Sequence, residues 1–221
     1  MARKEYLVKT AKKNKITLSR IICVIAGVTI ISIGLTFMRY AAFGVDPVTC
    51  LNLGIAKKLG MSFGTWQLIM SIILFVGVFL SDRGKVGFGT LYNMVAIGYT
   101  SDILLWVIGK IPLFDALFLL IRIIYFIFGF LVLYFGAAVY IEANMGVSPY
   151  DAIAIIIVEK IKRQNLFRWI RIGTDALCVI GGILTQSNVG VGTLLTVLFA
   201  GPLIALYRKL LIEMKIFKGI K

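Results

Sequence analysis

The feature that most constrains the fold is a series of six apolar runs, each close to the length that crosses a lipid bilayer. The runs are Ile21–Met38, Trp66–Leu80, Leu91–Ile108, Ala116–Ile141, Ile170–Thr185 and Val191–Leu206. A helix needs about 20 mainly apolar residues to cross the hydrocarbon core. A membrane barrel would show alternating rather than continuous apolar segments. With 60% hydrophobic and 15% charged residues, the chain also departs from a soluble domain. We therefore expect an all-α, polytopic helical membrane protein.

A sequence repeat divides the chain into two similar halves. The motif Gly-Val-x-Pro occurs at 44–47 and at 146–149, an offset of 102 residues. Downstream, "GFGTLYNMVAIG" from Gly87 aligns with "GVGTLLTVLFAG" from Gly190 at an offset of 103. Two motifs that recur in one order predict two homologous membrane repeats, residues 20–110 and 116–210, joined by a loop at 111–115. Residues 1–19 and 211–221 are then basic tails.

Each Gly-Val-x-Pro motif predicts the start of a short helix. Asp46 and Ser148 are good N-cap residues, and proline suits the first turn of a helix. The apolar stretches that follow, before Lys57 and Glu159, are about half the length that a crossing needs. We expect six transmembrane helices and two short helices, re-entrant or interfacial. Six crossings put both termini on one side and make the two halves inverted.

The distribution of basic residues predicts that both termini are cytoplasmic. The first 20 residues carry seven Lys or Arg, and "YRKLLIEMKIFKGIK" carries five. Basic flanks mark the cytoplasmic side of membrane segments and contact anionic lipid headgroups. The same rule does not separate six crossings from eight, because both arrangements place most basic residues inside and few outside. The length of the two short segments decides for six.

Residue content argues against several other functions. The chain has no histidine, so Ser-His-Asp catalysis and histidine metal sites do not arise. The acids show no catalytic spacing, and Cys23, Cys50 and Cys178 lie in apolar segments at no metal-like spacing. We expect no enzyme activity, no cofactor and no metal. The net charge of +14 flanks membrane segments and lacks the aromatic interleaving of a nucleic-acid site, so nucleic acid is not an expected partner.

The starts of the two short helices are the candidate solute-binding site. In inverted repeats they meet near the membrane midplane, where unpaired N–H groups at a helix start favour a solute. Asp175, inside an apolar helix, joins them as a charge at membrane depth. The candidate residues are Gly44, Asp46, Pro47, Gly146, Ser148, Pro149, Asp151 and Asp175. The alternative is that both motifs are turns that start interfacial helices without touching a solute.

Two further groups of residues are expected to be structural. Arg39, Asp102 and Glu142 are charges in or beside apolar segments and are expected to be buried polar residues. An Arg39–Glu142 pair is one arrangement, and snorkelling to the interface is the other. The Gly-x-Gly-Thr motifs lack the lysine of a phosphate-binding loop, so we expect structural turns at Gly87, Gly89, Thr90, Gly190, Gly192 and Thr193.

The paired Gly-Val-x-Pro elements, each followed by Gly-x-Gly-Thr-Leu, resemble the YczE/YitT-type family of bacterial integral membrane proteins. The resemblance covers about residues 20–210 and is carried by "GVDPVTCLNLGIAKKLGMSFGTW" and "VGFGTLYNMVAIGYTSDIL". The chain stops after "KIFKGIK", without the soluble C-terminal domain of many YitT proteins, and so is most similar to the YczE type. The resemblance implies a multi-pass protein of the bacterial cytoplasmic membrane and implies no substrate.

These features favour a permease or channel-like protein for a small solute. Two alternatives stay open. One is a non-transporting accessory or regulatory membrane protein, and the other is the substrate-binding subunit of a vitamin-type uptake complex, because six helices in about 200 residues also suit that role. The expected partners are membrane lipids, an unknown small solute, and either a second copy of the chain or a partner membrane protein.

Overall fold

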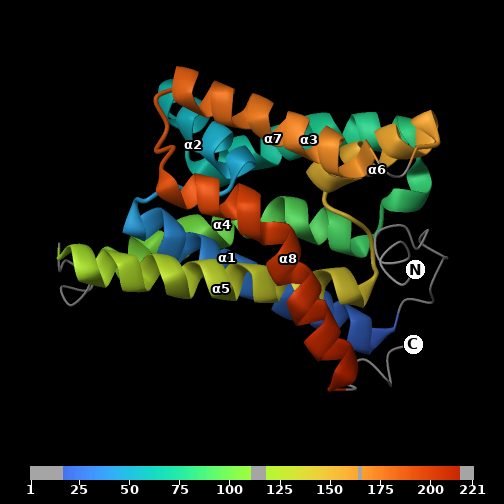
Figure 1. Cartoon of the computed structure of the whole chain (residues 1–221), viewed down its shortest axis with the longest axis horizontal. Coiled ribbons are helices and arrows are strands. Elements are labelled where there is room, and N and C mark those ends of the chain that lie inside the picture. Colours follow the sequence, from blue (N-terminus) through green and yellow to red (C-terminus); the bar gives the residue numbers. More distant parts are fainter. Residues whose placement is uncertain (1–16, 111–117, 164–165, 215–221) are drawn as a thin grey trace.

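The computed structural model describes residues 17–110, 118–163 and 166–214, and every regular element within them is a helix (Figure 1). The predicted tails and connecting loop lie largely outside these residues. Two α-helices are short, α2 (Pro47–Leu59) and α6 (Pro149–Ile161), and a 3-10 turn, η1, covers Arg83–Lys85. The long helices are α1 (Leu18–Ala41), α3 (Phe63–Ser81), α4 (Phe88–Ile108), α5 (Leu119–Ala143), α7 (Phe167–Leu184) and α8 (Val191–Glu213).

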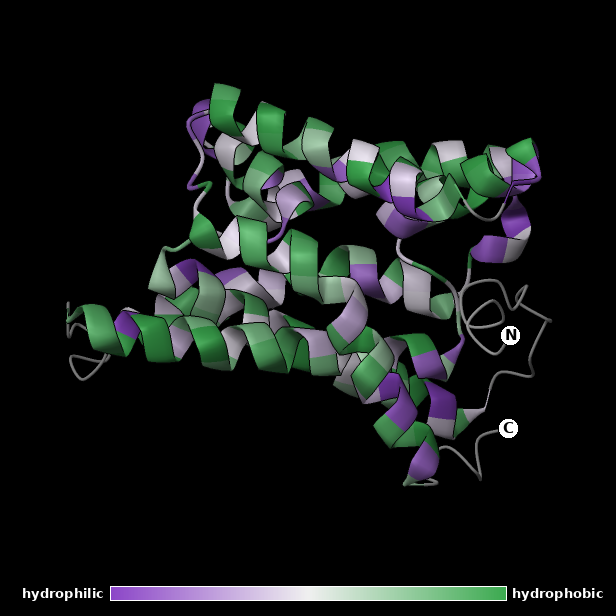
Figure 2. Cartoon of the chain, viewed as in Figure 1, coloured by the Kyte–Doolittle hydropathy of each residue, from purple (hydrophilic) through white to green (hydrophobic). Residues whose placement is uncertain are grey.

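The outer surface of the helices is suited to lipid. Five of the described helices, α1, α3, α4, α5 and α8, are long and apolar enough to cross a membrane. The 18 residues of α7 include three charges, Arg168, Arg171 and Asp175. Large apolar side chains such as Leu120 and Leu177 are about 70% exposed, and apolar residues predominate along the helices (Figure 2). So much exposed apolar surface indicates contact with hydrocarbon. The prediction of an all-helical membrane protein is confirmed.

Helices α1 and α5 pack closely against each other in the lower part of Figure 1 and run antiparallel. A Cβ on Gly34 would lie 2.4 Å from the backbone nitrogen of Leu133, and one on Gly136 would lie 2.7 Å from the backbone nitrogen of Ile31. Small residues at such a crossing let two backbones approach closely. Gly34 and Gly136 are separated by the same 102 residues as the two Gly-Val-x-Pro motifs.

The other helices and this pair are arranged in two layers. Helix α4 packs against α1, and α8 packs against α5, so these four form one layer. Helices α2, α3, α6 and α7 form the second layer, at the top of Figure 1, and α3 joins it to α4. Pro202 lies inside α8, and the helix changes direction along its length in Figure 1, as expected where proline removes a helical hydrogen bond.

The two short helices begin as their sequences predict. The Asp46 side chain accepts a hydrogen bond from the backbone N–H of Thr49 at 3.1 Å, and Ser148 Oγ accepts one from the N–H of Asp151 at 3.2 Å. Each helix has 13 residues, with proline in its first turn. At about 1.5 Å per residue each spans about 20 Å, which is shorter than a hydrocarbon core of about 30 Å.

Candidate functional site

The two glycine motifs contact each other crosswise. The backbone N–H of Gly89 donates to the carbonyl oxygen of Met145 at 2.8 Å, and the N–H of Gly192 donates to that of Phe43 at 2.8 Å. Each Gly-x-Gly-Thr turn is therefore bonded to the residue that precedes the distant Gly-Val-x-Pro motif. In addition, Thr90 Oγ1 donates to the carbonyl oxygen of Val147 at 2.9 Å. These bonds hold the start of each short helix in place.

Glycine is required at the first position of each Gly-Val-x-Pro motif for two reasons. Gly44 and Gly146 have φ values of 103° and 111°, a region that side-chain-bearing residues rarely adopt. A Cβ would also lie 2.5 Å from Thr193 Oγ1 at Gly44 and 2.4 Å from Thr90 Oγ1 at Gly146. The backbone at both motifs is thus packed directly on a threonine from a distant part of the chain.

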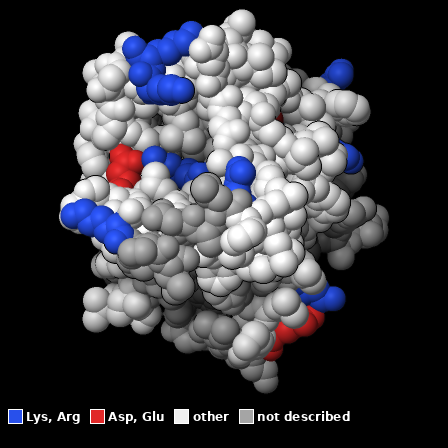
Figure 3. All heavy atoms as spheres, turned by 90° about the vertical axis from the view of Figure 1, so that its left-hand side faces the viewer, with Lys and Arg blue, Asp and Glu red and all other residues white. Residues whose placement is uncertain are grey.

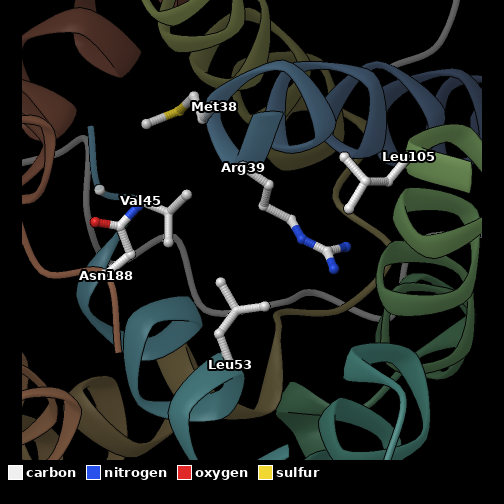
Figure 4. A pocket seen from close by; sticks show the side chains of 7 residues that line it. Met38, Arg39, Val45, Leu53, Leu105 and Asn188 are labelled. Atoms are coloured by element: carbon white, nitrogen blue, oxygen red, sulfur yellow. The ribbon is translucent and has the colours of Figure 1, made fainter. Parts of the chain in front are cut away.

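A pocket of about 210 Å³ lies beside the first Gly-Val-x-Pro motif. It is lined by Met38, Arg39, Gly44, Val45, Leu53, Leu105 and Asn188. Four of the seven lining residues have large apolar side chains, and the polar groups are one guanidinium and one amide. Figure 4 shows the side chain of Arg39 extending from α1 into the space between Leu53 and Leu105. Basic and acidic side chains gather around a hollow on the face at the left of Figure 1 (Figure 3).

The charge of Arg39 is balanced by α4. Its Nη1 atom donates to Ser101 Oγ at 2.8 Å and lies 2.9 Å from Asp102 Oδ1. The guanidinium carbon lies 4.5 Å from the centre of the Phe63 ring, and the N–H of Gly64 donates to the second oxygen of Asp102 at 2.7 Å. The Arg39 side chain is 9% exposed. A charge buried to this extent is stable only when it is paired and hydrogen-bonded, and both conditions are met.

A second group of charges lies where α6 begins beside α7. Arg171 forms ion pairs with Asp151 of α6 and, at 3.4 Å, with Asp175 one turn further along α7. The Tyr150 hydroxyl donates to Asp175 Oδ1 at 2.7 Å, and the Arg171 guanidinium lies over the Tyr150 ring at 4.7 Å. Ser148 Oγ donates to Asp151 at 2.7 Å. The first turn of α6 is therefore tied to α7 by charged and polar contacts.

Asp46, at the start of α2, lies near the same part of α7. Burial raises the pKa of its carboxyl above the usual value, because removal from water disfavours the charged form. The hydrogen bonds from Thr49 lower this pKa, and the nearby charges of Asp175 and Arg171 raise and lower it respectively. The candidate solute-binding residues Asp46, Asp151 and Asp175 are thus brought to one region, whereas Gly44 lines the pocket at Arg39.

Glu142 has a different partner from the one suggested by the sequence. Arg208 Nε of α8 lies 2.6 Å from Glu142 Oε1, and both side chains are mostly buried. The alternative of an Arg39–Glu142 pair is wrong, because α1 and α5 are antiparallel. Arg39 lies near the end of α1, beside the first half of α5, whereas Glu142 lies at the end of α5 beside the start of α1.

Sequence reasoning does not select three residues that the structure brings to these sites. Arg171 and Asp175 are four positions apart on one helix, a spacing at which opposite charges pair. The sequence could therefore have predicted Arg171 as a partner of Asp175. Tyr150 follows the second motif directly but matches no binding pattern. Asn188 lies in the turn before Gly190, and nothing in the linear sequence relates it to Arg39.

The described helices, their lipid-suited surface and the crosswise turns define a multi-pass α-helical membrane protein. Over residues 18–209 the chain matches the family of unknown function DUF6198, and it belongs to this family. It is 29% identical to the uncharacterized protein YyaS of Bacillus subtilis over 181 residues, which cover 82% of this chain and 88% of YyaS.

A second relative is the uncharacterized membrane protein YczE of Bacillus subtilis. The chain is 25% identical to it over 177 residues, which cover 80% of this chain and 79% of YczE. The predicted resemblance to the YczE type is confirmed by these matches. No solved structure matches the chain.

Proposed function

We propose that the chain is a permease of the bacterial cytoplasmic membrane and that the pocket at Arg39 is its solute site. The observation that carries the proposal is a buried ion pair, Arg39–Asp102, at the wall of a pocket beside the break between α1 and α2. Ionisable groups inside membrane segments are costly, and in membrane proteins they commonly mark solute or ion pathways. A pocket built at an interrupted helix is also a recurrent transporter feature.

In this proposal six helices cross the membrane, α7 among them, and the two halves are inverted repeats. The antiparallel crossing of α1 and α5 at Gly34 and Gly136 supports inversion, because these residues are related by the repeat offset. The hydrogen bonds from Gly89 to Met145 and from Gly192 to Phe43 are likewise related by the offsets of the two motifs. Inverted halves allow one solute site to open to either side.

The proposal includes a cytoplasmic location for both termini. The supporting observation is the excess of basic residues in the segments before α1 and at the end of α8. The pocket at Arg39 then lies toward the outer side, because the end of α1 lies at the opposite end of that helix from the N-terminal segment.

An asymmetry between the halves supports a protein that changes conformation. Helix α3 packs closely against α4, whereas α7 makes no comparable contact with α8 in the described part of the chain. In an alternating-access permease, related contacts of two inverted halves are closed on one side and open on the other. We therefore propose that the structure corresponds to one of two such states.

Transport by the purified protein tests the proposal. The full chain would be reconstituted into liposomes, and uptake of radiolabelled small solutes of anionic, cationic and zwitterionic classes would be measured with and without a proton or sodium gradient. We expect one class to accumulate. Asp175→Asn should abolish uptake without loss of folded protein, because it removes the charge shared with Arg171 and Tyr150, whereas Glu213→Gln, in an exposed pair, should not.

Failure of every solute class to accumulate in liposomes that contain folded protein would contradict a permease that acts alone. Uptake that appears only after addition of a separate ATPase module would instead favour the substrate-binding subunit. Stable co-purification with another membrane protein, without uptake, would favour the accessory protein.

A further inference from the structure

We propose that the pocket at Arg39 binds a small monocarboxylate with a compact apolar body. The assignment rests on the proposed function in taking this pocket as the solute site, and it adds the chemical class of the solute. In outline, the Arg39 guanidinium holds the carboxylate, and the apolar walls hold the rest of the molecule.

The first argument concerns the hydrogen-bond donors of Arg39. Both of its polar contacts within the described chain, to Ser101 and to Asp102, are made by Nη1. Nη2 and Nε are therefore left for a ligand, and the guanidinium extends into the pocket in Figure 4. The planar donors of arginine match the two oxygens of a carboxylate. Contacts with Phe63 and Asp102 hold the group in place before a ligand arrives.

The second argument concerns the walls. Apart from Arg39 and Asn188, the side chains that line the pocket are apolar: Met38, Val45, Leu53 and Leu105. A ligand with polar atoms on all sides, such as inorganic phosphate, would place some of them against these apolar walls without hydrogen-bond partners, which is unfavourable. An aliphatic body gains instead from burial against these side chains.

The third argument concerns size. The pocket has a volume of about 210 Å³. It is smaller than the sites of about 300–1,000 Å³ that hold drug-sized ligands. A branched carboxylic acid with about six heavy atoms therefore suits the space better than a vitamin or a nucleotide does.

A substitution at Asp102 distinguishes a ligand-binding role of Arg39 from a purely structural one. The Asp102 carboxylate repels an anion in the pocket and competes for Arg39. Asp102→Asn keeps the size of the side chain and removes this charge. We expect it to raise carboxylate affinity about tenfold or more, because like charges several ångströms apart repel strongly in a site of low dielectric.

The experiment measures binding to the full chain in lipid nanodiscs by titration calorimetry. The probes are isobutyrate, its uncharged isostere isobutyramide, and inorganic phosphate. We expect isobutyrate to bind and the other two to bind at least about tenfold more weakly. Arg39→Gln should weaken isobutyrate binding about tenfold or more, since it removes a charge-assisted hydrogen bond. Lys57→Gln, the same change of charge at an exposed position, should leave affinity unchanged.

Two further variants keep the test valid if Arg39→Gln does not fold. Leu53→Trp fills the pocket without replacing either member of the ion pair and should abolish isobutyrate binding, while Asp102→Asn should strengthen it. Equal binding of isobutyrate and isobutyramide, preference for phosphate, or absence of isobutyrate binding in the folded wild type would each overturn the proposal. Binding without uptake would contradict the permease function alone, and uptake only of other solute classes would contradict this solute assignment alone.

Discussion

Gly98 of α4 lies against Gly64 of α3 so closely that a Cβ on Gly98 would approach the Gly64 Cα to 2.7 Å. Gly201 of α8 stands 103 residues later, at the offset of the Gly-x-Gly-Thr motifs. A Cβ there would meet no described atom within 4 Å. Two positions related by the sequence repeat thus have different surroundings: Gly98 is packed against a neighbouring helix, and Gly201 is not.

Alanine substitutions at these two glycines should have unequal effects on stability. Gly98→Ala forces α3 and α4 apart and should destabilise the protein by about 1–3 kcal/mol. Gly201→Ala meets no atom of another helix within 4 Å and should change stability by less than about 1 kcal/mol, because the helix preference of alanine is offset by its place just before Pro202. Thermal unfolding of the two detergent-purified variants measures both effects. A Gly98→Ala variant as stable as wild type would contradict the close packing of α3 and α4.

A large side chain at Gly201 should block transport while leaving the fold intact. In the proposed second state, α7 closes on α8 as α3 closes on α4, and Gly201→Leu would prevent that approach. Gly77→Leu is the matched control, because a Cβ on Gly77 of α3 would also have no described neighbour within 4 Å. Uptake at the wild-type rate by Gly201→Leu would argue against closure at this position.

The Arg39–Asp102 pair should show strong coupling in a double-mutant cycle. Removal of one partner leaves the other charge buried and unpaired, so Arg39→Gln or Asp102→Asn alone should each cost about 3 kcal/mol. The double variant should lose much less than the sum, since the two groups are in direct contact. Unfolding of all four proteins in the same detergent gives the coupling energy. Additive losses would mean that the pair is not formed in the folded protein.

Membrane topology should follow six crossings. In a background without Cys23, Cys50 and Cys178, single cysteines would be placed at Arg83 and at Lys110, both exposed, and whole cells labelled with an impermeant thiol reagent. We expect Lys110→Cys to label and Arg83→Cys to be protected. The reverse pattern would mean that α2 and α6 cross and that the two halves are parallel. Lys85 is unsuitable as a probe, because it is buried against Glu159.

Much of the local structure could be predicted from the sequence because it depends on neighbours in the chain. The starts of α2 and α6 follow from a capping side chain and a proline within the first turn. The long helices follow from the length of the apolar runs. The charge partners could not be predicted in this way. Glu142 pairs with Arg208, which is 66 residues away, and only the packing of α5 on α8 brings them together.

The sequence by itself determined the class of protein, the two short helices and the turns, because a continuous apolar run has no stable place in water and a cap acts within one turn of its helix. Only the tertiary structure decided which charges meet and where a pocket forms. Arg39 and Asn188 line one pocket although they stand far apart in the chain. Their meeting depends on the directions in which the helices cross, and close contacts between glycines such as Gly34 and Gly129 set those directions.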